Sequence, residues 1–254
     1  DTANSLSLVL SPPSQLGDLS SLATTKRLDL ASNALASLGA FQPPPSLKHL
    51  DLKANRLAFP ALPLSLPTLR VLDLSSNALT GTFTLAGCPS LAALILSDNR
   101  LTGLAGLGSA PELATLVVKH NALTDLAPAL ARGSARALTK LSAAHNALTA
   151  LDVAPCPALA EVRVGHNDLS ALPSGLGDRL RVLDVGGNPR LGRAAAKKGV
   201  GAALAPLAGK PWLRAVTLRG TALGDLPDLR EALAAALPDL QILDDKRVAG
   251  KGAR

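Results

Sequence analysis

Three of the four histidines stand at similar places in the chain, and imidazole is a common zinc ligand. His120, His145 and His166 each come directly before an asparagine, at intervals of 25 and 21 residues. If the fold stacks these places at strand spacing, the three rings could in principle hold a metal ion. However, no column of cysteines or carboxylates beside them completes a tetrahedral set. We therefore expect histidines at the solvent edge and no metal site.

A second candidate is a row of aspartates, Asp29, Asp51 and Asp73, spaced 22 residues apart. At equivalent places in adjacent strands, their carboxylates would lie about 5 Å apart. Like charges this close disfavour one another unless a cation or a basic partner is near. Arg27 and Lys53 stand beside the row and can supply that charge. We expect the row to face basic groups of a partner rather than to bind a metal ion.

The sequence lacks the motifs of common enzyme classes. It contains no Gly-x-x-x-x-Gly-Lys-Ser/Thr phosphate loop, no His-Glu-x-x-His helix and no Gly-x-Ser-x-Gly turn. The two cysteines, Cys88 and Cys156, both begin a Cys-Pro-x-Leu segment. Matching places of this kind suggest small buried core residues rather than a redox or metal site. The sequence thus predicts a protein that is not an enzyme and has no cofactor.

An internal repeat explains where these residues stand. Around one asparagine the pattern reads Leu69-x-x-Leu72-x-Leu74-x-x-Asn77-x-Leu79, and similar segments recur along the chain. This pattern resembles the leucine-rich repeat and covers roughly residues 22–245. The repeat length resembles the 22-residue class of the protein phosphatase-1 regulatory subunit, the spliceosomal A-prime protein and the dynein light chain. Eight of the nine asparagines follow the frame, at intervals of 21 to 25 residues: Asn33, Asn55, Asn77, Asn99, Asn121, Asn146, Asn167 and Asn188.

The composition predicts the architecture that such a repeat builds. Apolar residues make up 47% of the 254 residues and aromatic residues only 2%, so the core must be aliphatic. Each Leu-x-Leu pair lies on one face of a short strand, and repeats must stack to bury these leucines. The asparagine amides can satisfy the backbone groups of the turns. We expect an α/β solenoid, a leucine-rich repeat horseshoe with a concave parallel β-sheet and a convex side of turns and short 3₁₀ or α segments.

Departures from the frame predict the remaining elements. The three-residue spacing of Leu101, Leu104 and Leu107 suits a 3₁₀ conformation on the return path. An insertion at 189–210 predicts a basic loop on the convex side with a short helix in the segment 200–204. The alternative is a longer crossover that packs under the sheet. The segment 229–244, Leu-Arg-Glu-Ala-Leu followed by Leu-Pro-Asp-Leu-Gln-Ile-Leu-Asp, resembles the C-terminal cap of intracellular leucine-rich repeat proteins.

These features divide the chain into four parts. We expect an N-terminal cap at 1–21, with a first irregular strand in the segment 6–10. About nine repeats follow at 22–225, including the insertion. A C-terminal cap occupies 226–245, and a basic tail occupies 246–254.

The concave face is the candidate site, because the residues before, between and after each leucine pair point outward from the sheet. Its first strands carry the aspartate row, its middle is apolar, and its later strands are basic. An apolar centre with charged flanks is typical of a protein-docking surface. The alternative is that valine and isoleucine are merely good strand residues on an unused surface. The candidate partner-binding residues are Arg27, Asp29, His49, Asp51, Lys53, Val71, Asp73, Ile95, Val117, Lys119, Lys140 and Arg163.

The net charge of +7 bears on the kind of partner. Residues 1–127 contain eight basic and eight acidic residues, whereas residues 128–254 contain 18 basic and 11 acidic residues. A basic half is compatible with phosphate contacts to RNA, yet base stacking has almost no aromatic residues to use. Candidate contacts to RNA or to an assembly are Arg190, Arg193, Lys197 and Lys198.

The functional prediction is therefore a non-catalytic scaffold that binds a protein partner within a multi-subunit complex. A ribonucleoprotein component with basic contacts to RNA is the alternative. No apolar run reaches the roughly 18 residues of a membrane span, and the first residues do not resemble a signal peptide. We expect an intracellular protein, cytoplasmic, ciliary or nuclear, with no membrane contact.

Overall fold

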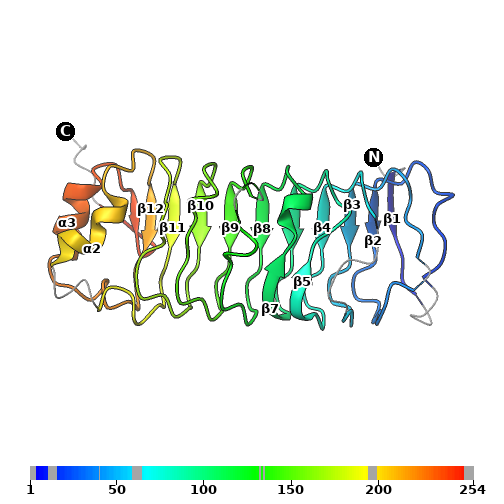
Figure 1. Ribbon diagram of the computed structural model, residues 1–254, viewed down its shortest axis with the longest axis horizontal. Helices are drawn as coiled ribbons and strands as arrows, with labels where there is room; N and C mark the ends of the chain where they lie inside the picture. Colours follow the sequence, from blue (N-terminus) through cyan, green and yellow to red (C-terminus); the bar gives the residue numbers. More distant parts are fainter. Residues whose placement is uncertain are drawn as a thin grey trace.

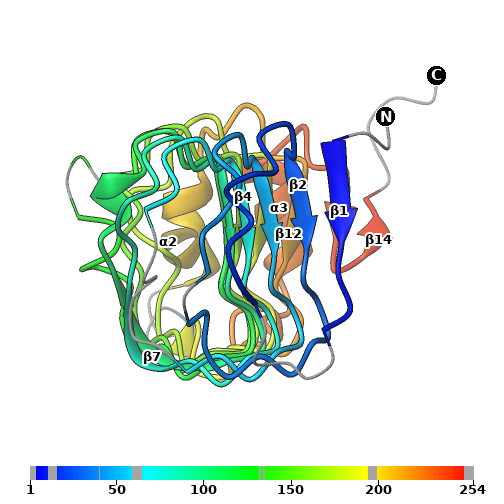
Figure 2. The ribbon, with the colours of Figure 1, turned by 90° about the vertical axis from the view of Figure 1, so that its right-hand side faces the viewer.

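Short strands stand side by side in one long sheet, and the rest of each coil returns behind them. The computed structural model describes residues 4–10, 16–39, 41–58, 65–131, 133, 135–193 and 199–248. In this part of the chain the sheet has the order β1-β2-β3-β4-β6-β8-β9-β10-β11-β12-β13-β14, and only the last pair is antiparallel (Figure 1). Viewed along the solenoid, the coils superimpose with the strands on one side (Figure 2). The expected leucine-rich repeat solenoid is confirmed.

The strands are in register because the repeat places equivalent residues one coil apart. Side chains alternate along a strand, so the middle residue of each points into the core. Leu50, for example, is 1% exposed and pairs with Leu28 on one side and Leu72 on the other. The strands are β1 Ser5–Ser7, β2 Arg27–Asp29, β3 His49–Asp51, β4 Val71–Asp73, β6 Ala93–Ile95, β8 Thr115–Val117, β9 Lys140–Ser142, β10 Glu161–Arg163, β11 Val182–Asp184, β12 Ala215–Thr217, β13 Ile242–Leu243 and β14 Lys246–Arg247.

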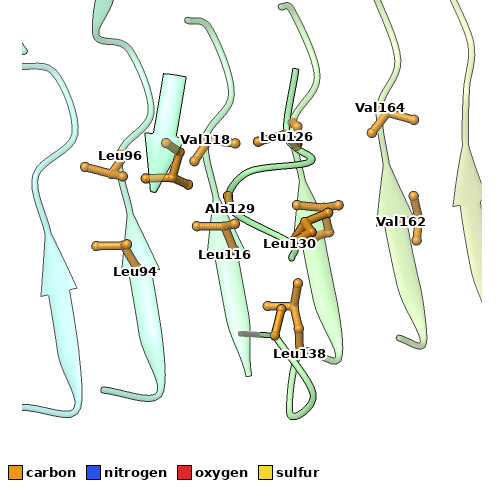
Figure 3. Packing of buried hydrophobic residues seen from close by; sticks show 14 of the residues in the cluster. Leu94, Leu96, Leu116, Val118, Leu126, Ala129, Leu130, Leu138, Val162 and Val164 are labelled. Carbon is orange, nitrogen blue, oxygen red and sulfur yellow. The ribbon is translucent and has the colours of Figure 1, made fainter. Parts of the chain in front are cut away.

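The core lies between the sheet and the return segments and is aliphatic, as the composition predicts. Leu94 and Leu116, on neighbouring strands, are completely buried. Leu126 and Leu138, from the segment that follows β8, approach the same layer from the other side (Figure 3). Each strand leucine therefore packs both against its counterparts in adjacent coils and against the crossover of its own region.

The predicted asparagine ladder is present, and it links each coil to the one before it. Asn99 Nδ2 donates to the carbonyls of Leu96 and Ser97 in its own coil and to Leu74 in the preceding coil, at 3.0–3.1 Å. Its Oδ1 accepts the N–H of Leu79, also in the preceding coil, at 3.1 Å. One amide thus satisfies backbone groups that the short strands leave unpaired, and the other ladder asparagines repeat this arrangement.

The residue before each ladder asparagine adopts a left-handed conformation. The φ angles of Ser76, Asp98 and His145 are all 55°, although none of these residues is glycine. In the last two coils glycine takes the same place, as Gly187 with φ 66° and Gly220 with φ 71°. A left-handed residue costs roughly 1 kcal/mol or more when it carries a Cβ atom. The repeated asparagine bonds on either side of the turn hold this strained residue in place.

One prediction about the return path is wrong. Leu101 and Leu104 do not form a 3₁₀ segment, since they lie in β7 (Arg100–Ala105), which pairs in parallel with β5 (Thr80–Thr84). The register shifts by one residue where Gly81 and Thr82 face Leu101 and Gly103. This irregularity breaks the two-residue alternation, so leucines three apart can both be buried. The third leucine of this spacing, Leu107, begins the 3₁₀ helix η2 (Leu107–Ser109).

The insertion packs into the core, as the longer-crossover alternative predicts. Its helix α2 spans Val200–Leu204 and continues as the 3₁₀ helix η3, Ala205–Leu207. Leu204 and Leu207 are buried, and α2 lies against α3 of the C-terminal region. None of the helices in the described ranges is both long and apolar enough to cross a bilayer.

The C-terminal region closes the solenoid with the expected helix, α3 (Leu229–Ala236). In the last repeat Thr221 replaces the ladder asparagine, and its hydroxyl donates to the carbonyl of Leu218 and accepts the N–H of Gly224, both in its own coil. From the following coil, Asp244 Oδ1 accepts the N–H groups of Leu218 and Arg219 at 2.7 and 2.8 Å. Lys246–Arg247, which the sequence places in a basic tail, pair with β13 as β14. At the other end β1 covers Ser5–Ser7 and pairs with β2. The boundaries of the four parts stay a prediction.

Replacing Asn99 by alanine should lower the free energy of unfolding by about 1–3 kcal/mol, because three backbone carbonyls and one backbone N–H lose their partner. Chemical denaturation of the variant and the parent protein measures this change. Asn4 is the matched control, since it is the asparagine outside the repeat frame and no hydrogen bond of its side chain occurs within the described ranges. Equal effects of Asn99→Ala and Asn4→Ala would contradict the role of the ladder.

Candidate functional site

The outward side chains of the strands form one continuous surface, which we call the sheet face. It consists of the first and third residues of each three-residue strand, together with the residue two positions after the third. The pairing aligns these residues in columns, so that Asp29, Asp51 and Asp73 are direct neighbours, followed by Ile95 and Val117. The predicted acidic, apolar and basic zones therefore lie in this order along the sheet (Figure 1).

The acidic zone is hollowed. A depression of about 280 Å³ lies over β2, β3 and β4. Burial raises the pKa of the Asp51 carboxyl, and the neighbouring charges of Asp73 and Asp29 raise it further. The backbone N–H and the charge of Lys53 oppose this shift. The lining residues are Ser5, Arg27, Leu28, Asp29, His49, Leu50, Asp51, Val71, Asp73 and Ile95.

The aspartates of this row also have a structural role that the sequence alone did not indicate. Each accepts a hydrogen bond from the backbone N–H two residues later: Asp29 from Ala31, Asp51 from Lys53 and Asp73 from Ser75, at 2.8–2.9 Å. Asp184 makes the same bond to Gly186. Side-chain bonds of this kind end a strand and begin a turn. Aspartate in this column therefore serves the repeat itself, whatever else it binds.

The predicted compensating cations act on the row by charge and not by ion pairs. Among the ion pairs of the described residues, none joins Arg27 or Lys53 to Asp29, Asp51 or Asp73. The charge of Lys53 nevertheless lowers the pKa of Asp51, and Arg27 lines the same hollow. His49, also in this hollow, has a pKa below the usual value because burial and the charges of Arg27 and Lys48 disfavour the imidazolium.

The middle of the sheet face is apolar and half-buried. Val71, Ala93 and Ile95 lie on β4 and β6, and Thr115 and Val117 lie on β8. The middle residues of the same strands are buried leucines. The outward residues can therefore be changed without removing any of the core.

A second hollow, of about 380 Å³, lies over β8, β9 and β10 and is basic. Glu161 lies beside it on β10, and its Oε1 is 3.1 Å from Lys140 Nζ and 2.6 Å from Arg163 Nε. Lys119 has no ion pair with any residue that the structure describes. The lining residues are Val117, Lys119, His120, Lys140, Ser142, Ala144, His145, Arg163 and Asp184.

The three histidines stack face to face along the rim of the basic hollow. The ring centroids of His120 and His145 are 4.2 Å apart, and those of His145 and His166 are 4.3 Å apart. The rings are parallel within 9°. Since the nitrogen lone pairs lie in the ring planes, parallel rings direct them side by side rather than toward one metal ion. No cluster of metal-binding side chains occurs in the described ranges.

Burial lowers the pKa of His145, and the neighbouring His120, His166 and Lys119 lower it further. Asp184 opposes this shift. The middle ring of the stack is therefore harder to protonate than an ordinary imidazole.

The sequence missed three residues of the basic hollow. Glu161, Ser142 and Asp184 occupy the same columns as the predicted residues, so the repeat frame could have found them. The repeat frame does not specify the direction in which a long side chain points. It therefore could not predict that Glu161 pairs with two cations.

The remaining candidates lie elsewhere. Arg190 and Arg193 are exposed on the insertion, where Arg193 Nε donates to the carbonyl of Pro189. Lys197 and Lys198 lie outside the described residues. Cys88 and Cys156 are free and buried, as predicted, and burial raises the pKa of both thiols to about 11. Such thiols are poor nucleophiles at neutral pH.

Comparisons with known proteins agree with this fold. A family model described as "Leucine Rich repeat" matches residues 65–82. Among solved structures, the chain is similar to YopM from Yersinia enterocolitica WA-314, with 27% identity and a TM-score of 0.66 over 96% of this chain and 47% of that chain. The chain thus spans about half the length of that protein.

Two further structures show the fold alone. YopM of Yersinia pestis, described as a leucine-rich effector protein, has 21% identity and a TM-score of 0.60, over 94% of this chain and 65% of that chain. The leucine-rich repeat domain of LRIM1 has 20% identity and a TM-score of 0.60, over 94% and 74%. Curated protein sequences gave no match. Membership of the 22-residue class stays a prediction.

The pKa of His145 should lie below 6.5, the ordinary value for this side chain. Replacing both His120 and His166 by asparagine, which tolerates the left-handed turn, should raise this pKa toward 6.5, because it uncovers the ring and removes two neighbouring charges. Titration of the imidazole proton resonances by NMR measures both values. An unchanged His145 pKa in the double variant would show that the stack does not set it.

Proposed function

We propose that this chain is a non-catalytic scaffold that binds a protein partner through its sheet face, within a multi-subunit complex. Leucine-rich repeat proteins commonly use the strand side of the solenoid as an extended binding surface. The observation that carries the proposal is the order of the zones on one continuous face: an acidic hollow, a half-buried apolar middle and a basic hollow. Such a surface matches a partner that presents basic, apolar and acidic groups in the same order.

The apolar middle would supply most of the binding free energy. Val71, Ile95 and Val117 are flanked by charged zones that remain wet, and apolar contacts at the centre of an interface are the most completely desolvated. The two charged zones would set the orientation of the partner and its rate of association. This division of roles follows from the position of each zone along the sheet.

The location we propose is intracellular: cytoplasmic, nuclear or ciliary. The proposal depends on the resemblance to the 22-residue class and on the cysteines, because free thiols are typical of a reducing compartment. A ribonucleoprotein component with basic contacts to RNA is the second candidate. The exposed Arg190 and Arg193 of the insertion favour it.

Changing Ile95 to aspartate together with Val117 to lysine should abolish partner binding and leave the fold intact, since both side chains point away from the core. Partners are recovered by proximity labelling and co-purification with the parent protein, and binding is then measured for each variant. Thermal melts of the variants check the fold.

Ala215→Asp together with Thr217→Lys is the matched control, because it places the same charges on β12 of the sheet face, beyond the strands that line the basic hollow. This variant should keep the partner. Binding could instead survive Ile95→Asp with Val117→Lys and be lost in Arg190→Glu with Arg193→Glu. That result would show that the sheet face is not the binding surface, and it would favour the ribonucleoprotein alternative.

A further inference from the structure

Beside the basic hollow, one carboxylate already lies between two of its cations. Glu161 Oε1 lies 3.1 Å from Lys140 Nζ and 2.6 Å from Arg163 Nε, so a single acidic side chain neutralises part of two cations. All three side chains belong to the sheet face, since Glu161 and Arg163 are the first and third residues of β10 and Lys140 begins β9. Lys140 and Arg163 are therefore already placed to hold one carboxylate between them.

Two further polar side chains line this hollow and are not paired with Glu161. Lys119 forms no ion pair within the described ranges, although it lines the same space. Ser142 lies on β9 and is 4% exposed. Its side chain lines the hollow, so its hydroxyl can bond a ligand atom there.

The histidine stack adds charge on one side of the hollow when the pH falls. His120 and His145 line the hollow directly, and His166 stacks on His145 from the next coil. The charged groups around them are Lys119 on the strand side, Asp184 from β11 and Asp98 at the equivalent place of the preceding turn. Each imidazolium that forms beside Lys119 makes the hollow more attractive to an anion, and an anion in turn favours the imidazolium.

We propose that this hollow binds a carboxylate-rich segment of the protein partner, which replaces Glu161 between Lys140 and Arg163, contacts Lys119, and binds more tightly as the histidines become protonated. This inference deepens the proposed function and depends on it. The carboxylate is favoured over an RNA phosphate because the group that already lies between Lys140 and Arg163 is a carboxylate.

The probe for the test is a fluorescently labelled oligo-glutamate peptide, and its binding to the full chain is followed by fluorescence anisotropy at low salt. Lys119→Ala together with Lys140→Ala should weaken binding about fivefold to tenfold, since each exposed charge pair contributes up to about 1 kcal/mol. Arg179→Ala together with Arg181→Ala removes the same charge from exposed positions outside the hollow and should change binding less than about twofold. Equal losses in the two double variants would overturn the site.

The Glu161→Gln variant tests whether the hollow is a specific binding site or only part of a diffuse basic surface. The change keeps the size of the side chain but removes the competing carboxylate, so it should tighten binding of the oligo-glutamate peptide severalfold. Unchanged or weaker binding by this variant, with a thermal melt like that of the parent, would show that Glu161 does not hold the place of a ligand. Tighter binding of oligouridine RNA than of the peptide would favour the ribonucleoprotein alternative and overturn the carboxylate assignment.

The histidines are tested by the pH dependence. Affinity for the peptide should rise between about pH 6.5 and about pH 5.5, because the pKa of His145 lies below the ordinary imidazole value of 6.5. His120→Asn together with His145→Asn should remove this rise. A parent protein with the same affinity at both pH values would overturn the role of the stack. If the peptide does not bind but Ile95→Asp with Val117→Lys still abolishes partner binding, the hollow is wrongly assigned and the proposed function stands.

Discussion

The structure depends on one requirement, that the backbone groups of each tight turn find hydrogen-bond partners although the strands are only three residues long. The ladder asparagine meets it by donating to carbonyls of two coils and accepting an N–H from the earlier one, as Asn99 does. Because this bond pattern needs the next coil at a fixed distance and register, it also sets the repeat. The in-register columns of the sheet face follow from it, and so does the pairing of a left-handed residue with every ladder asparagine.

The repeat frame therefore made most of the fold predictable. Asparagine spacing and the Leu-x-Leu pairs determine which residues form strands, which are buried and which share a column, and these agree with the structure. The frame was insufficient where an element departs from it. The leucine spacing of β7 suggests a 3₁₀ segment, but the one-residue shift in its pairing with β5 also brings Leu101 and Leu104 to one face. A bulge depends on the partner strand, which the spacing within one segment does not contain.

The candidate site was predictable in outline and not in detail. Column positions place Lys119, Lys140 and Arg163 in one region, and they place the aspartate row in another. They do not show that Glu161 turns toward two of these cations, or that the aspartates bond the backbone N–H groups of their own turns. Both features depend on side-chain direction over distances of a few ångströms. Column position also does not show that, within the described ranges, Arg27 and Lys53 form no ion pair with the aspartate row.

The constant strand spacing makes the sheet face a molecular ruler. From β3, at the centre of the acidic hollow, to β9, at the centre of the basic one, the sheet advances by four strands. At about 4.8 Å per strand this is about 19 Å. A partner helix lying along the sheet would need its basic and acidic groups about 13 residues apart, whereas an extended segment would need only about six. The number of residues between the basic and the acidic groups of a partner sequence therefore indicates whether that partner binds as a helix or as an extended segment.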